Sequence, residues 1–92
     1  MNLPAKHNGK KPIKVTAIRQ YGLQLLFEDQ REYQLDLTSL ITQKTIFWRL
    51  KNFRYFQKVS IDPLGGLCWP EGEDIAPEKV LQYITPFINS PG

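Results

Sequence analysis

Residues 61–80, IDPLGGLCWPEGEDIAPEKV, bring three prolines, three glycines and five acids together around one tryptophan. Glycine accepts positive φ angles and proline fixes its own φ, so both residues mark chain reversals. A catalytic loop or a tightly folded structural turn would each require such residues. We interpret the segment as two reversals around a short strand that buries Trp69, with Asp62 and Asp74 bonding turn amides. This interpretation predicts positive φ at Gly72 and at one of the two adjacent glycines, Gly65 or Gly66.

The chain before this segment alternates with the period of a half-buried strand. Apolar positions recur every second residue in LQLLF (23–27) and in EYQLDL (32–37), and IKVTAIRQ (13–20) is a plausible first strand. We therefore expect an antiparallel three-stranded meander over residues 13–37 with one solvated face. The inward side chains would be Leu23, Leu25, Phe27, Tyr33, Leu35 and Leu37. Because the turn EDQR (28–31) has no glycine, a positive φ is expected at Asp29 or Gln30.

Helical spacing follows the meander. Phe47, Leu50 and Phe53 lie three residues apart, as in short helical turns, and Thr38 or Ser39 is a candidate cap. A strand through residues 59–61 should come next. A final helix should begin at Pro77, pack an apolar stripe on the sheet and stop at Pro86.

These elements predict the α+β class. We expect a small single domain of antiparallel hairpins, with a short middle helical segment and a short C-terminal helix packed on the sheet. The expected organisation is a flexible basic tail at 1–12, the domain at 13–88 and a C-terminal tail at 89–92. No apolar run approaches the roughly 20 residues of a membrane span, and the lysine-bearing N-terminus lacks the apolar region of a secretory signal. The single cysteine, Cys68, excludes an internal disulfide and suits a reducing cytosol, so we expect a cytoplasmic protein.

Charge is segregated along the second half of the chain. Residues 37–61 contain no acid and five bases, whereas residues 62–78 contain no base and five acids. The two blocks face each other or simply solvate two surfaces, or else the first block forms a basic binding surface. The sequence leaves both possibilities open.

An ordered set of turn and strand residues resembles the bacterial family catalogued as domain of unknown function 2442. The similarity covers about residues 13–84 and includes the hairpin LQLLFEDQREYQLDL. It is carried above all by Asp62, Gly65 or Gly66, Trp69, Pro70, Gly72, Asp74 and Pro77. The chain departs from the family in its glycine-free first hairpin turn and in its more aromatic, basic segment 47–58. It also has Ala76 where a capping residue is usual, which leaves Asp74 as the candidate substitute.

The resemblance implies a small α+β domain without an established activity, so it transfers no catalytic residue. Some members carry a fused helix-turn-helix segment, for which this chain has no room. Members often occur beside another small protein in what looks like a toxin–antitoxin arrangement, and this is an analogy only.

The residues themselves favour a protein that is not an enzyme. Glu71, Glu73 and Asp74 are adjacent acids on a turn, whose side chains should diverge, so we expect neither a metal site nor acid–base catalysis. Cys68 is expected to be a buried inert thiol, since the one histidine, His7, lies far away in the N-terminal tail. We expect no cofactor.

The remaining candidate site is FWRLKNFRYFQK, residues 47–58, where bases and aromatics interleave. Phe47, Leu50, Phe53 and Phe56 are expected in the core. The predicted exposed contact residues are Trp48, Arg49, Lys51, Arg54 and Tyr55. They suit a protein-interaction module, such as an antitoxin-like or regulatory partner of another small bacterial protein. The alternative is a nucleic-acid-binding accessory protein that uses the same segment.

Overall fold

The computed structural model describes residues 11–85. The expected tails at 1–12 and 89–92 therefore lie outside the described residues, except for Lys11 and Pro12. Pro12 already belongs to the first strand, one residue before its expected start. The amide of Lys11 donates to the Glu28 carboxylate at 3.1 Å.

The predicted meander is confirmed. Strands β1 (Pro12–Arg19), β2 (Gly22–Phe27) and β3 (Glu32–Asp36) pair antiparallel in sequence order. The inward positions of β2 are fully buried, and Tyr33 on β3 is half-buried with its ring edge-on to Phe27. In the glycine-free turn the positive φ falls on Gln30, at 73°. A second positive φ, at Tyr21 (66°), lies in the turn between β1 and β2 and was not predicted.

Three short helical segments follow β3, in the region where helical spacing was predicted. They are α1 (Thr38–Gln43), the 3-10 helix η2 (Thr45–Lys51) and α2 (Phe53–Phe56). The expected cap at Thr38 or Ser39 is wrong, since no side chain caps α1 from its N-cap position. Asp36 at the end of β3 instead accepts from the Thr38 amide at 2.9 Å and from its hydroxyl at 2.6 Å.

The turn-rich segment forms a second sheet. Strands β4 (Ser60–Ile61), β5 (Leu67–Cys68) and β6 (Asp74–Ile75) pair antiparallel in that order. Asp62 closes the first reversal as predicted, accepting from the amides of Leu64 (2.8 Å) and Gly66 (3.0 Å).

The second reversal closes differently from the prediction. Its bonds run between backbone groups, from the Gly72 amide to the Trp69 carbonyl (3.0 Å) and from the Trp69 amide to the Glu73 carbonyl (2.9 Å). Asp74 is exposed and lies in β6 opposite Cys68, so its predicted role as a turn-capping side chain is wrong. Exposed Pro70 sits inside this reversal, where no amide donor is required of it.

The glycines of this segment confirm the predicted turn geometry. Gly65 has φ 94° and Gly72 has φ 108°, whereas Gly66 is not in the positive-φ region. Gly66 is needed for a different reason, since a Cβ there would overlap the carbonyl oxygen of Ile75 across the β5–β6 pair. At Gly72 a Cβ would meet nothing within 4 Å.

We therefore expect Gly66→Ala to destabilise the domain more than Gly72→Ala. Forcing a methyl group against fixed backbone should cost about 2 kcal/mol, whereas alanine at positive φ should cost about 1 kcal/mol. Gly72→Val should cost more than Gly72→Ala, because a β-branched residue tolerates that φ least. Urea midpoints of the variants test this order, and a larger loss for Gly72→Ala than for Gly66→Ala would contradict it.

The C-terminal helix packs on the four-stranded sheet as predicted. Helix α3 (Pro77–Gln82) begins at Pro77, and its N-cap residue Ala76 provides no side-chain bond. No side chain replaces that cap, so the suggested substitution by Asp74 is wrong. The helix also ends before Pro86, because the chain turns into β7 (Ile84–Thr85), which pairs with β3 through Leu35 and Ile84.

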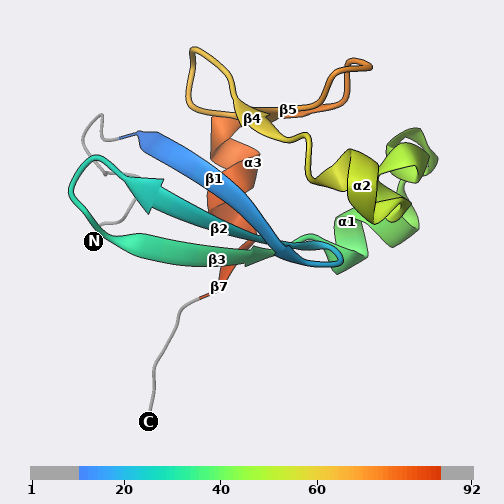
Figure 1. Cartoon of the computed structure of the whole chain (residues 1–92), viewed down its shortest axis with the longest axis horizontal. Helices are drawn as coiled ribbons and strands as arrows, with labels where there is room; N and C mark the ends of the chain where they lie inside the picture. The colour runs from blue at the N-terminus through green and yellow to red at the C-terminus, as the bar shows by residue number, and fades with distance from the viewer. Residues whose placement is uncertain (1–10, 86–92) are drawn as a thin grey trace, which may run out of the picture.

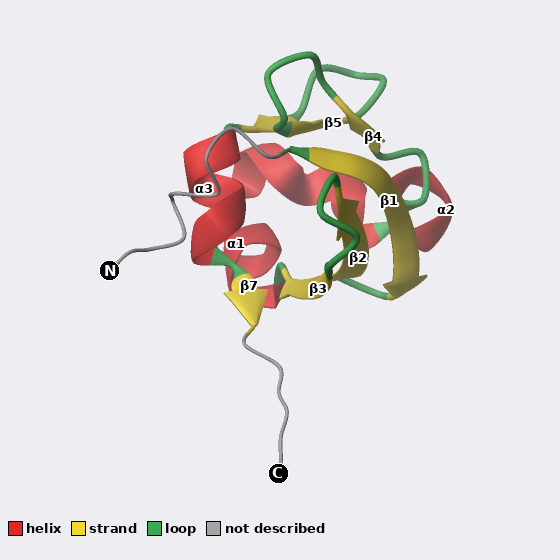
Figure 2. Ribbon diagram, turned by 90° about the vertical axis from the view of Figure 1, so that its left-hand side faces the viewer, coloured by secondary structure: helices red, strands yellow, loops and turns green. Residues whose placement is uncertain are grey.

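Together these elements confirm the α+β class. Figure 1 shows α3 behind the strands of the larger sheet, whose order is β1-β2-β3-β7, with β4 and β5 above it. Figure 2 shows α1 and α3 on one side of that sheet. Between these layers lies one core, formed by Leu23, Leu25, Phe27, Leu35, Leu37, Leu40, Ile41, Phe47, Leu50, Phe56, Leu67, Trp69, Ile75 and Val80. None of the helices in residues 11–85 has the length and apolar character needed to cross a bilayer.

Candidate functional site

The aromatic and basic segment 47–58 folds as η2 followed by α2. The three-residue turn of η2 directs Phe47 and Leu50 into the core. Trp48 falls between these positions and is 60% exposed, as predicted. The guanidinium of Arg49 lies over its ring, 4.8 Å from the centroid, in a cation–π contact that orients the indole.

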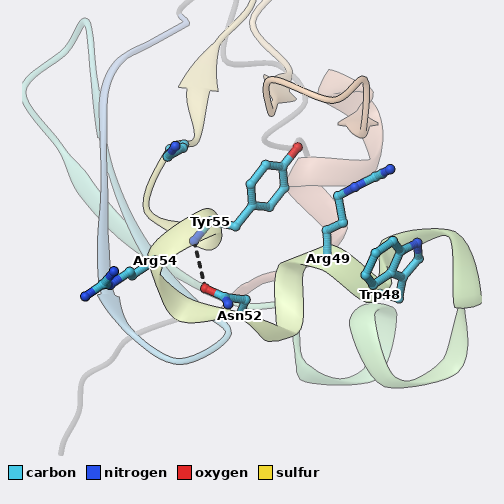
Figure 3. Close-up of a pocket in the computed structure, with 6 residues that line it drawn as sticks. Trp48, Arg49, Asn52, Arg54 and Tyr55 are labelled. Carbon is cyan, nitrogen blue, oxygen red and sulfur yellow. Dashed lines mark hydrogen bonds between the residues drawn. The ribbon is translucent and has the colours of Figure 1, made fainter.

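A groove of about 390 Å³ runs along this segment. We call it the Trp48 groove, and its lining residues are Trp48, Arg49, Asn52, Arg54, Tyr55 and Lys58. Figure 3 shows Trp48 and Arg49 on one side and Arg54 on the other, with Asn52 and Tyr55 between them. Asn52 is held by its capping bond, because its side-chain oxygen accepts from the Tyr55 amide at 3.2 Å.

Four of the five predicted contact residues line this groove. The fifth, Lys51, is exposed but does not contribute to the lining. Sequence reasoning left out Asn52 and Lys58. Lys58 belongs to the acid-free block and was detectable from its charge, whereas Asn52 gave no signal apart from its suitability as a helix cap.

Arg49 and Tyr55 are half-buried rather than openly exposed, which corrects the prediction for both residues. The acidic loop 69–74 folds over the hydroxyl group of Tyr55. That hydroxyl donates to Glu73 Oε1 at 2.6 Å and accepts from the Glu71 amide at 2.7 Å. Arg49 Nη1 donates to the other oxygen, Glu73 Oε2, at 3.0 Å. Tyr55 and Arg49 therefore attach the acidic loop to the edge of the groove.

Glu73 is the one buried charged residue of the described chain, with 8% of its surface exposed. Burial by itself raises the pKa of Glu73. The hydrogen bonds from Tyr55, from its own backbone amide and from Arg49 outweigh burial, so the net pKa is lowered. Burial and the bond to Glu73 raise the pKa of Tyr55. At neutral pH Glu73 is therefore an ionised carboxylate and Tyr55 a neutral phenol, and their hydrogen bond holds the acidic loop in place.

The two charge blocks touch at a single ion pair within residues 11–85. Arg49 and Glu73 form it, so the interpretation that the blocks face each other holds for this pair. The other bases of the acid-free block, Lys44, Lys51, Arg54 and Lys58, form no ion pair within the part of the chain that the structure describes. The interpretation as a basic binding surface therefore still applies to these four residues.

Within residues 11–85, the other side chains that could bind a metal or act as nucleophiles do not form a cluster. Among residues 11–85 no three His, Cys, Asp or Glu side chains gather in a way that would hold a metal ion. Glu71 and Asp74 are exposed on either side of buried Glu73. Cys68 is half-buried rather than fully buried, a correction to the prediction, and its sulfur lies 3.3 Å from the Ser60 hydroxyl.

The described domain coincides with a known protein family. A family model described as "Protein of unknown function (DUF2442)" matches residues 12–86. The chain belongs to this family. The DUF2442 match begins at the first residue of β1 and ends one residue after β7, so it includes every described strand and helix. No curated protein and no solved structure matches the chain.

Proposed function

We propose that this DUF2442 chain is a non-catalytic binding module of the cytoplasm that docks onto another protein through the Trp48 groove. The observation that carries the proposal is the position of Trp48. Trp48 is 60% exposed, yet it is held on a helix that is anchored by buried Phe47 and Leu50. Exposed tryptophans beside arginines are enriched among residues that dominate binding energy.

The aromatic and arginine residues of the Trp48 groove are of the types found at the centre of protein–protein interfaces. An indole and a phenol ring form its apolar part, and Arg49, Arg54 and Lys58 supply positive charge around them. A partner that covers Trp48 would remove its apolar surface from water, while the bases would steer the encounter. In this proposal the partner is another small bacterial protein, in the antitoxin-like or regulatory arrangement that the family resemblance implies.

We expect Trp48→Ala to weaken the native complex by about 2 kcal/mol or more, which is roughly thirtyfold in Kd, while the domain stays folded. The measurement is affinity capture of the partner from the native source, followed by titration of the purified partner with wild-type and variant protein. Thermal unfolding of the free variant confirms that the fold survives.

Ile46→Ala is the matched control. Ile46 lies on the same helix and is 69% exposed, but it does not line the Trp48 groove. This variant should leave affinity nearly unchanged. Equal losses for the two variants would show that helix η2 in general, and not the Trp48 groove, makes the contact. No loss for Trp48→Ala would overturn the proposal.

Nucleic-acid binding is the second candidate, favoured by the gathering of Arg49, Arg54 and Lys58 around an exposed indole. It makes a different prediction about salt. Affinity for a nucleic acid should fall steeply with salt concentration, and Arg54→Ala should reduce the salt slope by about one unit. Weak salt dependence and survival of the native complex after nuclease treatment favour the protein partner.

A further inference from the structure

The charges of the Trp48 groove are only partly compensated within the chain. Arg49 pairs with Glu73, but Arg54 and Lys58 are exposed and have no acidic partner among residues 11–85. In Figure 3 Arg49 and Arg54 stand on opposite sides of Asn52 and Tyr55. The groove therefore combines an apolar part with positive charge on both sides. Two of its cations, Arg54 and Lys58, remain available to a ligand.

The chain itself contains an example of what this surface binds. The Glu73 carboxylate reaches Arg49 and Tyr55 at the edge of the groove with distances of 3.0 Å and 2.6 Å. It is bound well enough to be buried and ionised. Charge-assisted bonds of this kind are shorter and stronger than neutral ones. A carboxylate is thus a ligand that this surface demonstrably accepts at one edge.

We propose that the occupant of the Trp48 groove is an acidic segment of the partner protein, with an apolar side chain against Trp48 and carboxylates on Arg54 and Lys58. This inference rests on the proposed function and specifies the chemistry of the partner. Complementary charge both speeds encounter and selects among partners, so a segment with one apolar residue and nearby glutamates or aspartates suits the groove.

The surroundings favour an acidic peptide over a nucleic acid. Glu71 lies next to Tyr55, whose hydroxyl accepts from its amide, and Asp74 is exposed further along the same loop. A nucleic acid carries a phosphate at every residue and would meet these like charges if it continued past the groove, whereas a peptide can place uncharged residues beside them. A short segment that ends within the groove avoids them.

The test uses the indole N–H signals of the two tryptophans in a heteronuclear NMR spectrum. The signal of Trp48 is assigned by its loss in Trp48→Phe. Trp69 donates to the Phe56 carbonyl inside the core and reports on the fold. The probe is a short peptide in which glutamates flank one central leucine. We expect a saturable shift of the Trp48 signal, with the Trp69 signal unmoved.

Two charge-matched double variants locate the contact. Arg54→Gln with Lys58→Gln should weaken peptide binding by about tenfold, because it removes charge-assisted bonds. Lys14→Gln with Lys79→Gln removes the same charge from exposed positions outside the groove and should leave affinity nearly unchanged. An equal loss in both double variants would show unspecific attraction and overturn the inference.

Two further probes complete the design. The same peptide with glutamine in place of glutamate should not bind, and a short oligothymidine should bind more weakly than the acidic peptide. Tighter binding of the oligothymidine, or no saturable Trp48 shift with the acidic peptide, would overturn the inference. If Trp48→Ala still weakens the native complex in that case, the proposed function stands and only the acidic character of the occupant is wrong.

Discussion

Replacing Trp69 by alanine should lower the free energy of unfolding by about 3–5 kcal/mol, the range for removing a large buried aromatic side chain. Trp69 is 4% exposed and stacks on Phe56 with ring centroids 6.0 Å apart. Its indole N–H donates to the Phe56 carbonyl at 3.0 Å. The ring thus joins the second sheet to α2, and its loss opens a cavity and leaves that carbonyl with only the longer bond from the Val59 amide, at 3.3 Å.

A domain of this size has a total stability of only about 5–15 kcal/mol, so the variant should be close to unfolding at ambient temperature. Urea titration of the wild type and the variant measures the change. Trp48→Ala is the matched control, because it removes the same side chain from a position that is 60% exposed, and its midpoint should hardly move. Similar midpoints for both variants would contradict the structural role of Trp69.

Replacing Glu73 by glutamine should cost about 3 kcal/mol at neutral pH, the lower end of the range for breaking a buried ion pair. The carboxylate accepts from Tyr55 at one oxygen and from Arg49 at the other. A glutamine amide has one acceptor oxygen, so its amino group must face one of the two donors. The loss stays at the lower end because Arg49 has 38% of its side-chain surface exposed and can turn to water.

The same variant should flatten the acid limb of the stability profile. The folded-state pKa of Glu73 is below the ordinary value of 4.5, so its ionised form is favoured by folding. This stability is fully present above pH 4.5 and is lost as the pH falls through the lower pKa of the folded state. In Glu73→Gln that part of the pH dependence should disappear.

Asp36 should keep its own acid dependence in the variant. The hydrogen bonds from the Thr38 hydroxyl and amide lower the pKa of Asp36, burial opposes them, and the charge of Arg19 also lowers this pKa. Glu71→Gln is the control, because Glu71 is exposed and contributes its backbone amide to the network. Unfolding midpoints from pH 7 down into the acid range test both glutamates. A profile as steep in Glu73→Gln as in the wild type would contradict the assignment.

Local patterns in the sequence anticipated those parts of the fold that depend on neighbouring residues. The period-two alternation of residues 23–37 predicted which face of the meander is buried, and Leu23, Leu25 and Leu35 are fully enclosed. Turn chemistry predicted the positive φ angles at Gly65 and Gly72 and the bonds of Asp62 to turn amides. A residue's φ and its nearest amides are local properties, which explains why these predictions were confirmed.

The elements that were missed are two residues long and exist only through distant partners. Strand β6 pairs with β5 and strand β7 with β3, and neither segment is long enough to show a period of its own. The helix α3 was expected to reach Pro86, but pairing of Ile84 with Leu35 ends it earlier. Competition from such tertiary pairing overrides local helical preference.

The same distinction between local and tertiary determinants applies to the candidate site. The sequence by itself determined that segment 47–58 is basic and aromatic and that Trp48 is out of phase with the core residues around it. Only the tertiary structure decided which cations are compensated, because the partner of Arg49 lies 24 residues away and that of Tyr55 18 residues away. Whether two charge blocks meet depends on how the second sheet packs against α2 through Trp69. That packing joins surfaces far apart in the chain, so it appears in no local pattern.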